Sequence, residues 1–373
     1  MRTLRNVVTL FVMTLLLSAH AANTGLNSGT ATASRSADAN RIETAAPAPA
    51  PAAPVNSWAL TTDSAEAAPA VAQPAQITPE EFYRSAWKAA EQNFLWRDRL
   101  TDWAKWEHKY DGQLKSFDDA ERAINEMLGT LKDGYTYYKD PTVTADRAAR
   151  AAETNVVSYR VLPLSNIGYI KVRTFGSNNT AAEFEAAVTA LNKLKVGAFI
   201  IDLRDNGGGY VHQAFKMFSL FVDEGLFTTL KGHYNGSPYT EELFVRKGGL
   251  EDIENGTKVS PSDRLPNLVG NKPVIVLVNG NSASASEMFS GALRDAVGAT
   301  LVGTKTFGKG IAQITVNLER GASVQVTFAE YFLPKGDSVH GKGIQPATAA
   351  STVGPTDPQL AAAVRVAKER MKP

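Results

Sequence analysis

The sequence predicts an α/β fold in which helices pack on a sheet. Short apolar runs alternate with helical patterns along the second half of the chain, and this alternation is typical of α/β folds. Strands are expected at residues 167–172, 198–203, 274–278 and 300–303, and helices at residues 180–194, 210–221 and 286–296. With 373 residues the chain is long enough to bury a large core.

Three further regions complete the expected architecture. Residues 313–317 and 323–329 alternate polar and apolar side chains and read as a hairpin. Residues 231–268 are rich in Gly, Asn, Ser and Pro and are expected to form an irregular insertion that overhangs the cleft. Residues 357–371 have an apolar face at helical spacing and predict a C-terminal helix.

The first 21 residues have the pattern of a signal peptide. Arg2 and Arg5 precede an apolar run over residues 7–17, and Ala-His-Ala at 19–21 is a cleavage pattern of small residues around one variable position. The apolar run is too short to cross a bilayer comfortably. We therefore expect an exported chain, periplasmic or secreted. The chain has no cysteine, so its stability has to come from the core without disulfides.

A linker and a helical region are expected before the main domain. Residues 22–76 are dominated by Ala, Pro, Ser and Thr and carry too little apolar bulk to fold, which predicts a disordered linker. Thr78 and Pro79 form a helix start, with an N-cap threonine followed by proline at the first helical position. Residues 77–145 are expected to form a helical N-terminal region, and residues 146–373 the domain that carries the motifs described next.

Ser284 and Lys309 are the candidate nucleophile and general base. Ser284 follows the strand over 274–278 and immediately precedes a helix, whereas Lys309 lies between two glycines that allow close approach of the backbone. A serine hydroxyl needs a neighbour that takes its proton during attack on a carbonyl. Lysine does this only when neutral, so its pKa has to fall well below the usual value of about 10.4, as burial in an apolar pocket makes it do.

Backbone amides near these residues are candidates for an oxyanion hole. Ala285 lies in the first turn of the helix after the serine, where backbone N–H groups are unpaired. Residues 202–209, Asp-Leu-Arg-Asp-Asn-Gly-Gly-Gly, follow another apolar strand, and consecutive glycines allow N–H groups to turn inward. Two convergent donors would stabilise a negatively charged oxygen.

Three motifs together resemble the signature of the C-terminal processing, or tail-specific, serine peptidases. They are D-L-R-D-N-G-G-G at 202–209, S-A-S-A-S-E at 282–287 and T-F-G-K-G-I-A-Q at 306–313. The resemblance implies a core similar to Clp protease and crotonase, and it makes residues 146–373 the catalytic peptidase domain. It also implies hydrolysis of peptide bonds in proteins, including bonds near C-termini, through a Ser/Lys dyad and an acyl-enzyme, without a cofactor.

The same resemblance assigns roles to individual residues. Ser284 is implied to be the nucleophile and Lys309 the general base, while Gln313 is implied to orient the lysine through a hydrogen bond. Gly208 and Ala285 are the implied oxyanion donors, and the neighbouring glycines of the turn stay open as alternatives to Gly208. Asp295 also matches a family position, where its role is structural.

One feature departs from the family pattern. Many members carry a PDZ domain, which captures the C-terminus of the substrate by strand addition, between the helical region and the catalytic core. Residues 137–167 are too few for such a domain. The departure leaves specificity for free C-terminal tails open.

Other chemistries and partners find less support in the sequence. A triad using His212 or His340 stays an alternative to the dyad, because triads are assembled in space; no His spacing suggests a metal site. With 39 basic and 38 acidic residues and no basic cluster, nucleic acid is not an expected partner. The expected partners are a protein or peptide substrate and, as an open question, an adaptor or regulator. Alternative functions are a catalytically idle peptide-binding scaffold of the same fold, or an amidase or esterase acting on a small acyl substrate.

Overall fold

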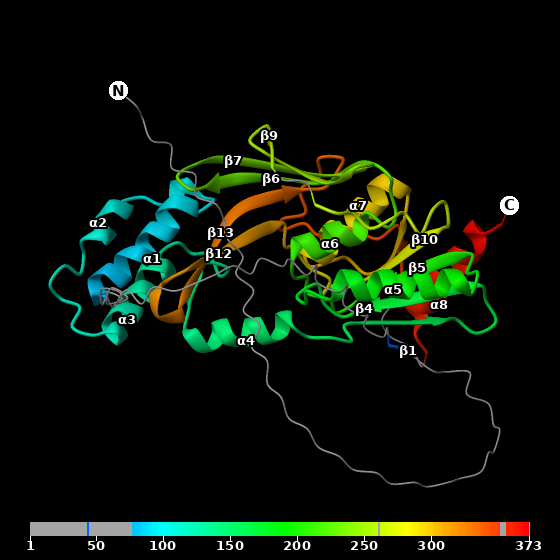
Figure 1. The fold of residues 1–373 in the computed structure, drawn as a ribbon, viewed down its shortest axis with the longest axis horizontal. Helices are drawn as coiled ribbons and strands as arrows, with labels where there is room; N and C mark the ends of the chain where they lie inside the picture. Colours follow the sequence, from blue (N-terminus) through cyan, green and yellow to red (C-terminus); the bar gives the residue numbers. More distant parts are fainter. Residues whose placement is uncertain (1–42, 45–76, 260–261, 351–355, 373) are drawn as a thin grey trace, which may run out of the picture. The chain divides into compact units, whose positions relative to one another are not determined.

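The computed structural model describes residues 43–44, 77–259, 262–350 and 356–372 (Figure 1). The predicted leader and almost all of the predicted linker lie outside these ranges. Within them, none of the helices is both long enough and apolar enough to cross a membrane.

The first sheet is mostly parallel, as the alternation of strands and helices predicts. Its strand order is β1-β3-β4-β5-β10-β11-β14. The strands are β1 (Glu43–Thr44), β3 (Val157–Val161), β4 (Ile167–Val172), β5 (Ala198–Asp202), β10 (Val274–Val278), β11 (Thr300–Gly303) and β14 (Thr348–Ala349). Strands β4 to β14 of this order run parallel, whereas β3 is antiparallel to β4 and β1 is antiparallel to β3.

Helices cover both faces of this sheet, which explains why the central strands β5 and β10 are buried along their whole length and are apolar except for Asp202 at the end of β5 (Figure 1). Phe199 and Ile201 of β5 belong to the large core shared with α5 (Thr180–Lys193), α6 (Val211–Phe218) and α7 (Ala285–Val297). Ile200, the residue between them, faces the other way and packs with α8 (Pro358–Arg370). The predicted mixed α/β core and C-terminal helix are therefore confirmed.

The second sheet is antiparallel and contains the predicted hairpin. Its order is β12-β13-β6-β7-β8-β9, and β2 pairs with β13. The strands are β2 (Tyr137–Lys139), β6 (Gly225–Tyr234), β7 (Ser237–Arg246), β8 (Gly249–Glu254), β9 (Thr257–Lys258), β12 (Ile311–Asn317) and β13 (Ser323–Phe332), with a short 3-10 turn, η2 (Glu319–Gly321), between the last two.

The prediction of an irregular insertion over residues 231–268 is wrong for most of that segment. It contains the tight hairpins that join β6 to β7 and β8 to β9, with Asn-Gly turns at 235–236 and 255–256. All four turn residues have positive φ, between 48° and 78°. Asn-Gly favours such turns, whose twist matches that of paired strands. Many residues of these strands are polar, so the sequence did not show the apolar runs by which strands are usually predicted.

The N-terminal helical region packs on the second sheet (Figure 1). It contains α1 (Pro79–Asn93), η1 (Arg97–Arg99), α2 (Trp103–Glu107) and α3 (Phe117–Gly129). Thr78 caps α1 through a reciprocal pair of hydrogen bonds with Glu81, as the predicted helix start requires. Phe82 and Tyr83 of α1 are buried together with Val324 and Val326 of β13. Between β2 and β4 the chain forms only α4 (Pro141–Ala151) and β3.

Candidate active site

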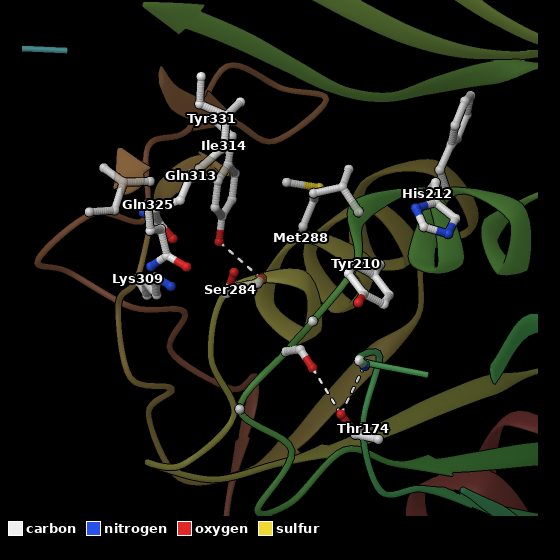
Figure 2. A pocket seen from close by; sticks show the side chains of 18 of the residues that line it. Thr174, Tyr210, His212, Ser284, Met288, Lys309, Gln313, Ile314, Gln325 and Tyr331 are labelled. Carbon is white, nitrogen blue, oxygen red and sulfur yellow. Dashed lines mark hydrogen bonds between the residues drawn. The ribbon is translucent and has the colours of Figure 1, made fainter. Parts of the chain in front are cut away.

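A cavity of about 1350 Å³ brings the predicted site residues together. Ser284, Lys309, Gln313 and Gly208 all line it, and Ala285 follows the serine at the start of α7. Figure 2 shows the Ser284 and Lys309 side chains at the same part of the pocket, with Tyr331 and Met288 beside the serine. The three sequence motifs thus converge on one cavity.

The backbone of Ser284 is strained. The residue has φ 56° and ψ −119°, a conformation that residues other than glycine rarely adopt. It makes the sharp turn between β10 and α7, and the fully buried Tyr331 hydroxyl donates a 3.1 Å hydrogen bond to the Ser284 carbonyl (Figure 2). Strain of this kind amounts to about 1 to 3 kcal/mol and is characteristic of functional positions.

Glu287 joins the serine loop to the lysine loop. Its side chain is fully buried and accepts a 3.0 Å hydrogen bond from the Ser284 N–H. The same carboxylate accepts bonds of 2.7 and 2.8 Å from the N–H groups of Gly308 and Lys309, and one of 2.5 Å from the Thr306 hydroxyl. One carboxylate therefore holds the backbones of both candidate catalytic residues in a common position.

The surroundings of Lys309 favour its neutral form. Burial lowers the pKa of Lys309 below the ordinary lysine value, and Arg147 lowers it further, whereas Asp133 acts in the opposite direction. The Lys309 Nζ atom lies 4.6 Å from the centre of the Tyr135 ring, which is part of the surroundings that bury it. Of the described carboxylates, none forms an ion pair with Lys309, so the lysine has the unpaired environment that a general base needs.

The glycine-rich turn lies directly against the serine. Gly208 has φ 97°, and a Cβ atom there would come within 2.6 Å of the Ala283 carbonyl and 2.9 Å of the Ser284 Cβ. The Gly208 N–H donates a 3.0 Å hydrogen bond to the Asn206 side chain in this conformation. Gly209 presses against the backbone at Phe175, where a Cβ would lie only 2.2 Å away. Both positions require glycine, and Gly208 borders the serine.

The other predicted residues take different positions. The Gln313 amide donates to the Thr327 hydroxyl at 3.4 Å, and no hydrogen bond among the described residues joins it to Lys309. Asp295 pairs with Arg294 and accepts from the Lys335 N–H, which agrees with a structural role.

Neither histidine candidate is hydrogen-bonded to the serine in the part of the chain that the structure describes. His212 lines the cavity and stacks on Tyr210 with ring centres 5.3 Å apart. Burial lowers the pKa of His212, with a smaller contribution from Lys216. His340 lies near Trp96, at 6.1 Å between ring centres. Within the described ranges, no group of three His, Asp or Glu side chains is placed to hold a metal ion.

Sequence reasoning missed several residues of this site. It gave Glu287 no role beyond its place in the 282–287 motif, and it gave Tyr135 and Arg147 no part in the cavity. The spacing of Glu287 three residues after Ser284 was a signal for its bond to the serine N–H, but nothing in the sequence indicated its bonds to the lysine loop.

Known proteins resemble both the sequence and the fold. Residues 166–349 match peptidase family S41. The chain is 29% identical over 247 residues to a carboxy-terminal-processing protease of Bartonella bacilliformis, covering 64% of this chain and 52% of that protein. It is 34% identical over 188 residues to carboxy-terminal processing protease CtpA of Bacillus subtilis, covering 50% of this chain and 36% of that protein.

Solved structures agree in fold. The photosystem II D1 C-terminal processing protease superposes with a TM-score of 0.54 at 20% identity, covering 78% of this chain and 97% of that one. A lipoprotein from Streptococcus agalactiae gives 0.58 at 15% identity, covering 80% and 99%. The chain matches only about a third to a half of the length of the curated relatives. The matched motifs, fold and sequence similarity assign residues 166–349 to peptidase family S41, and C-terminal processing proteases are among the proteins that this chain resembles.

Proposed function

We propose that the protein is an exported serine endopeptidase that hydrolyses peptide bonds of protein substrates, including bonds near C-termini, through Ser284 and Lys309. The observation that carries this proposal is the Glu287 carboxylate, which binds the backbone N–H groups of Ser284 and Lys309 at the edge of one large cavity. A binding scaffold has no need for a strained serine and an unpaired, partly buried lysine held in this way.

The proposed reaction has two half-steps. Neutral Lys309 takes the proton of the Ser284 hydroxyl as its oxygen attacks the substrate carbonyl, and the lysine then gives that proton to the leaving amine. The product of this half-step is an acyl-enzyme ester at Ser284. Water attacks the ester with Lys309 again as base, and the proton returns to the serine oxygen as the carboxylic product leaves.

The Ala285 and Gly208 N–H groups are the proposed oxyanion donors. A Cβ built on Gly208 would lie 3.0 Å from the Ala285 nitrogen, so the two peptide units are neighbours beside Ser284. Because the Gly208 N–H is bonded to Asn206 in this conformation, it has to exchange that bond for the substrate oxygen. The adjacent N–H of Gly209 is the alternative donor if this exchange does not take place.

Two measurements test the proposed function. Mass spectrometry of a mixed peptide library incubated with the full chain should show new internal or tail-trimmed fragments, and a serine-reactive acylating probe should label Ser284. Absence of both fragments and label would favour the idle scaffold. Turnover of small esters or amides with no peptide cleavage would favour the amidase or esterase alternative.

Export is part of the proposal and has its own test. The leader pattern over residues 1–21 supports it. The first residue of the protein recovered outside the cytoplasm should be Ala22, as N-terminal sequencing would show. Recovery of the uncleaved chain from the cytoplasm alone would contradict export.

A further inference from the structure

Two cationic side chains meet where β2, α4 and β12 come together, and one of them, Arg147, lines the cavity. The pair consists of Lys139, at the end of β2, and Arg147, on α4. Both side chains donate to the same hydroxyl, that of Thr315 on β12: the Arg147 Nη1 atom at 2.8 Å and the Lys139 Nζ atom at 3.5 Å. No step of the proposed peptide hydrolysis uses either of them.

Lys139 is a buried cation without a counter-ion. Its exposed fraction is 3%, and its second hydrogen bond goes to the neutral Oε1 atom of Gln325 at 2.7 Å. Burial lowers the pKa of Lys139 to about 8, and the charge of Arg147 contributes in the same direction. Throughout the described ranges, no carboxylate forms an ion pair with this lysine. A buried charge is normally paired, so this arrangement is unfavourable by itself.

Arg147 reaches across the mouth of the cavity. Its guanidinium bonds to Thr315 on the second sheet and lies 5.7 Å from the centre of the Tyr210 ring, which follows the glycine-rich turn of the first sheet. Arg147 and Gln325 both line the cavity that contains Ser284. In the described part of the chain this arginine also forms no ion pair. A planar guanidinium in this position is suited to bind a carboxylate through two parallel hydrogen bonds.

We propose that Arg147 and Lys139 form an anion subsite that binds a carboxylate of the peptide substrate. The proposal rests on the proposed function, because the ligand is the peptide that enters the Ser284 cavity. Such a carboxylate would supply the counter-charge that the pair lacks and would draw the peptide along the cavity past Ser284. Its source is either the terminal carboxylate of the chain or the side chain of an acidic residue.

Binding to the inactive Ser284→Ala chain tests the subsite separately from catalysis. Three fluorescent peptides of one sequence are compared by fluorescence polarisation: the free acid, the C-terminal amide, and the amide with glutamate as its last residue. The free acid should bind more tightly than the plain amide by a factor of about ten or more, the usual effect of a charge-assisted hydrogen bond. The glutamate amide identifies the source. If the glutamate amide binds as tightly as the free acid, the subsite accepts any carboxylate. If it binds only as tightly as the plain amide, the subsite requires the terminal carboxylate.

Two variants test whether the preference for the free-acid peptide depends on Arg147 and Lys139. Arg147→Gln and, independently, Lys139→Gln should each reduce the ratio of acid to amide affinity towards one, with folding checked by circular dichroism. Arg365→Gln removes the same charge from the exposed side of α8, which packs on the far face of the first sheet, and should leave the ratio unchanged. Equal binding of all three peptides, or a preference that survives both subsite variants, would overturn the subsite. Because affinity is measured without turnover, failure of peptide cleavage by the wild-type chain would count against the proposed function alone.

Discussion

The two sheets contribute to the cavity in different ways. The parallel sheet supplies the reacting groups: Ser284 follows β10 and Gly208 follows β5, at the same edge of the sheet. The antiparallel sheet and its neighbouring segments supply the surroundings of the lysine, through Tyr135 just before β2, Arg147 on α4 and Gln313 on β12. Lys309 lies on the loop that runs from β11 of one sheet to β12 of the other.

This difference separates two kinds of function within one site. Carboxyl ends of neighbouring parallel strands meet at one edge, so the positions of serine and glycine are set by the core itself. The electrostatic surroundings of the lysine depend on residues from the second sheet and α4, whose charges can change without altering the core. We therefore expect substitutions on the first side to abolish activity and substitutions on the second side to alter its pH dependence or its specificity.

The largest effect is expected for Ser284→Ala. Loss of the nucleophile should lower kcat for a cleavable peptide by roughly 10⁴-fold or more, as for other covalent serine enzymes. Circular dichroism should be unchanged, and relief of the positive φ strain is not expected, since alanine is strained there as well. Lys309→Ala should have a comparable effect. A variant at either position that retains near-normal kcat would contradict the dyad.

Glu287→Gln should have the next largest effect, because it weakens the link between the two loops. Glutamine offers one acceptor oxygen where the carboxylate receives four donors, so buried N–H groups lose their partners. We expect a loss of about 1 to 3 kcal/mol in the free energy of unfolding and a drop in kcat of roughly tenfold to a hundredfold.

Urea unfolding and steady-state kinetics measure the two effects of Glu287→Gln. Glu319→Gln, at an exposed position of η2, is the matched control and should change neither quantity. Normal activity in a destabilised Glu287→Gln chain would show that the link serves only folding.

The first sheet could be predicted from the sequence, and most of the second could not. Apolar strands that are buried on both faces, such as 274–278, stand out from their neighbours, and the motifs follow directly after them. In β7, the first six residues, Ser-Pro-Tyr-Thr-Glu-Glu, are mostly polar and the apolar residues come only at its end, so the Asn-Gly turns were the clearer sign of strands. The contacts of Glu287 and Arg147 join distant segments in space, and no local pattern encodes them.

The pH dependence should move in opposite directions in two variants of the second side. The rate should rise with pH as Lys309 loses its proton, because only the neutral amine is a base. Arg147→Gln removes a positive charge that lowers the pKa of Lys309, so the rising limb should shift to higher pH. Asp133→Asn removes a negative charge that raises the pKa of Lys309, so the rising part of the pH profile of this variant should shift to lower pH.

Profiles of kcat/KM against pH for an uncharged, C-terminally amidated peptide measure these shifts without a substrate carboxylate. Arg365→Gln serves as the control and should retain the wild-type limb. Shifts of the same sign in both variants would show that Lys309 is not the group that governs the limb, and a limb near 6.5 in all chains would indicate a histidine instead.

The smallest effect concerns stability rather than catalysis and is expected for Lys139→Met. The pKa of Lys139 is about 8 in the folded protein, below the usual value of about 10.4, so between these pH values the unfolded chain binds more protons than the native one. The contribution of this group to the free energy of unfolding therefore rises with pH across that window and is unfavourable and constant below it. Methionine at position 139 removes both the charge and the pH dependence that the charge causes.

The Lys139→Met variant should be more stable than the wild-type chain at pH 7, by an amount of order 2 kcal/mol, and this difference in the free energy of unfolding should shrink as pH rises towards 10. Lys309 titrates in both chains and cancels in the difference. Chemical unfolding at several pH values measures the stability difference between the two chains. A difference that does not change with pH would mean that Lys139 has a counter-ion in solution and that its charge is already neutralised.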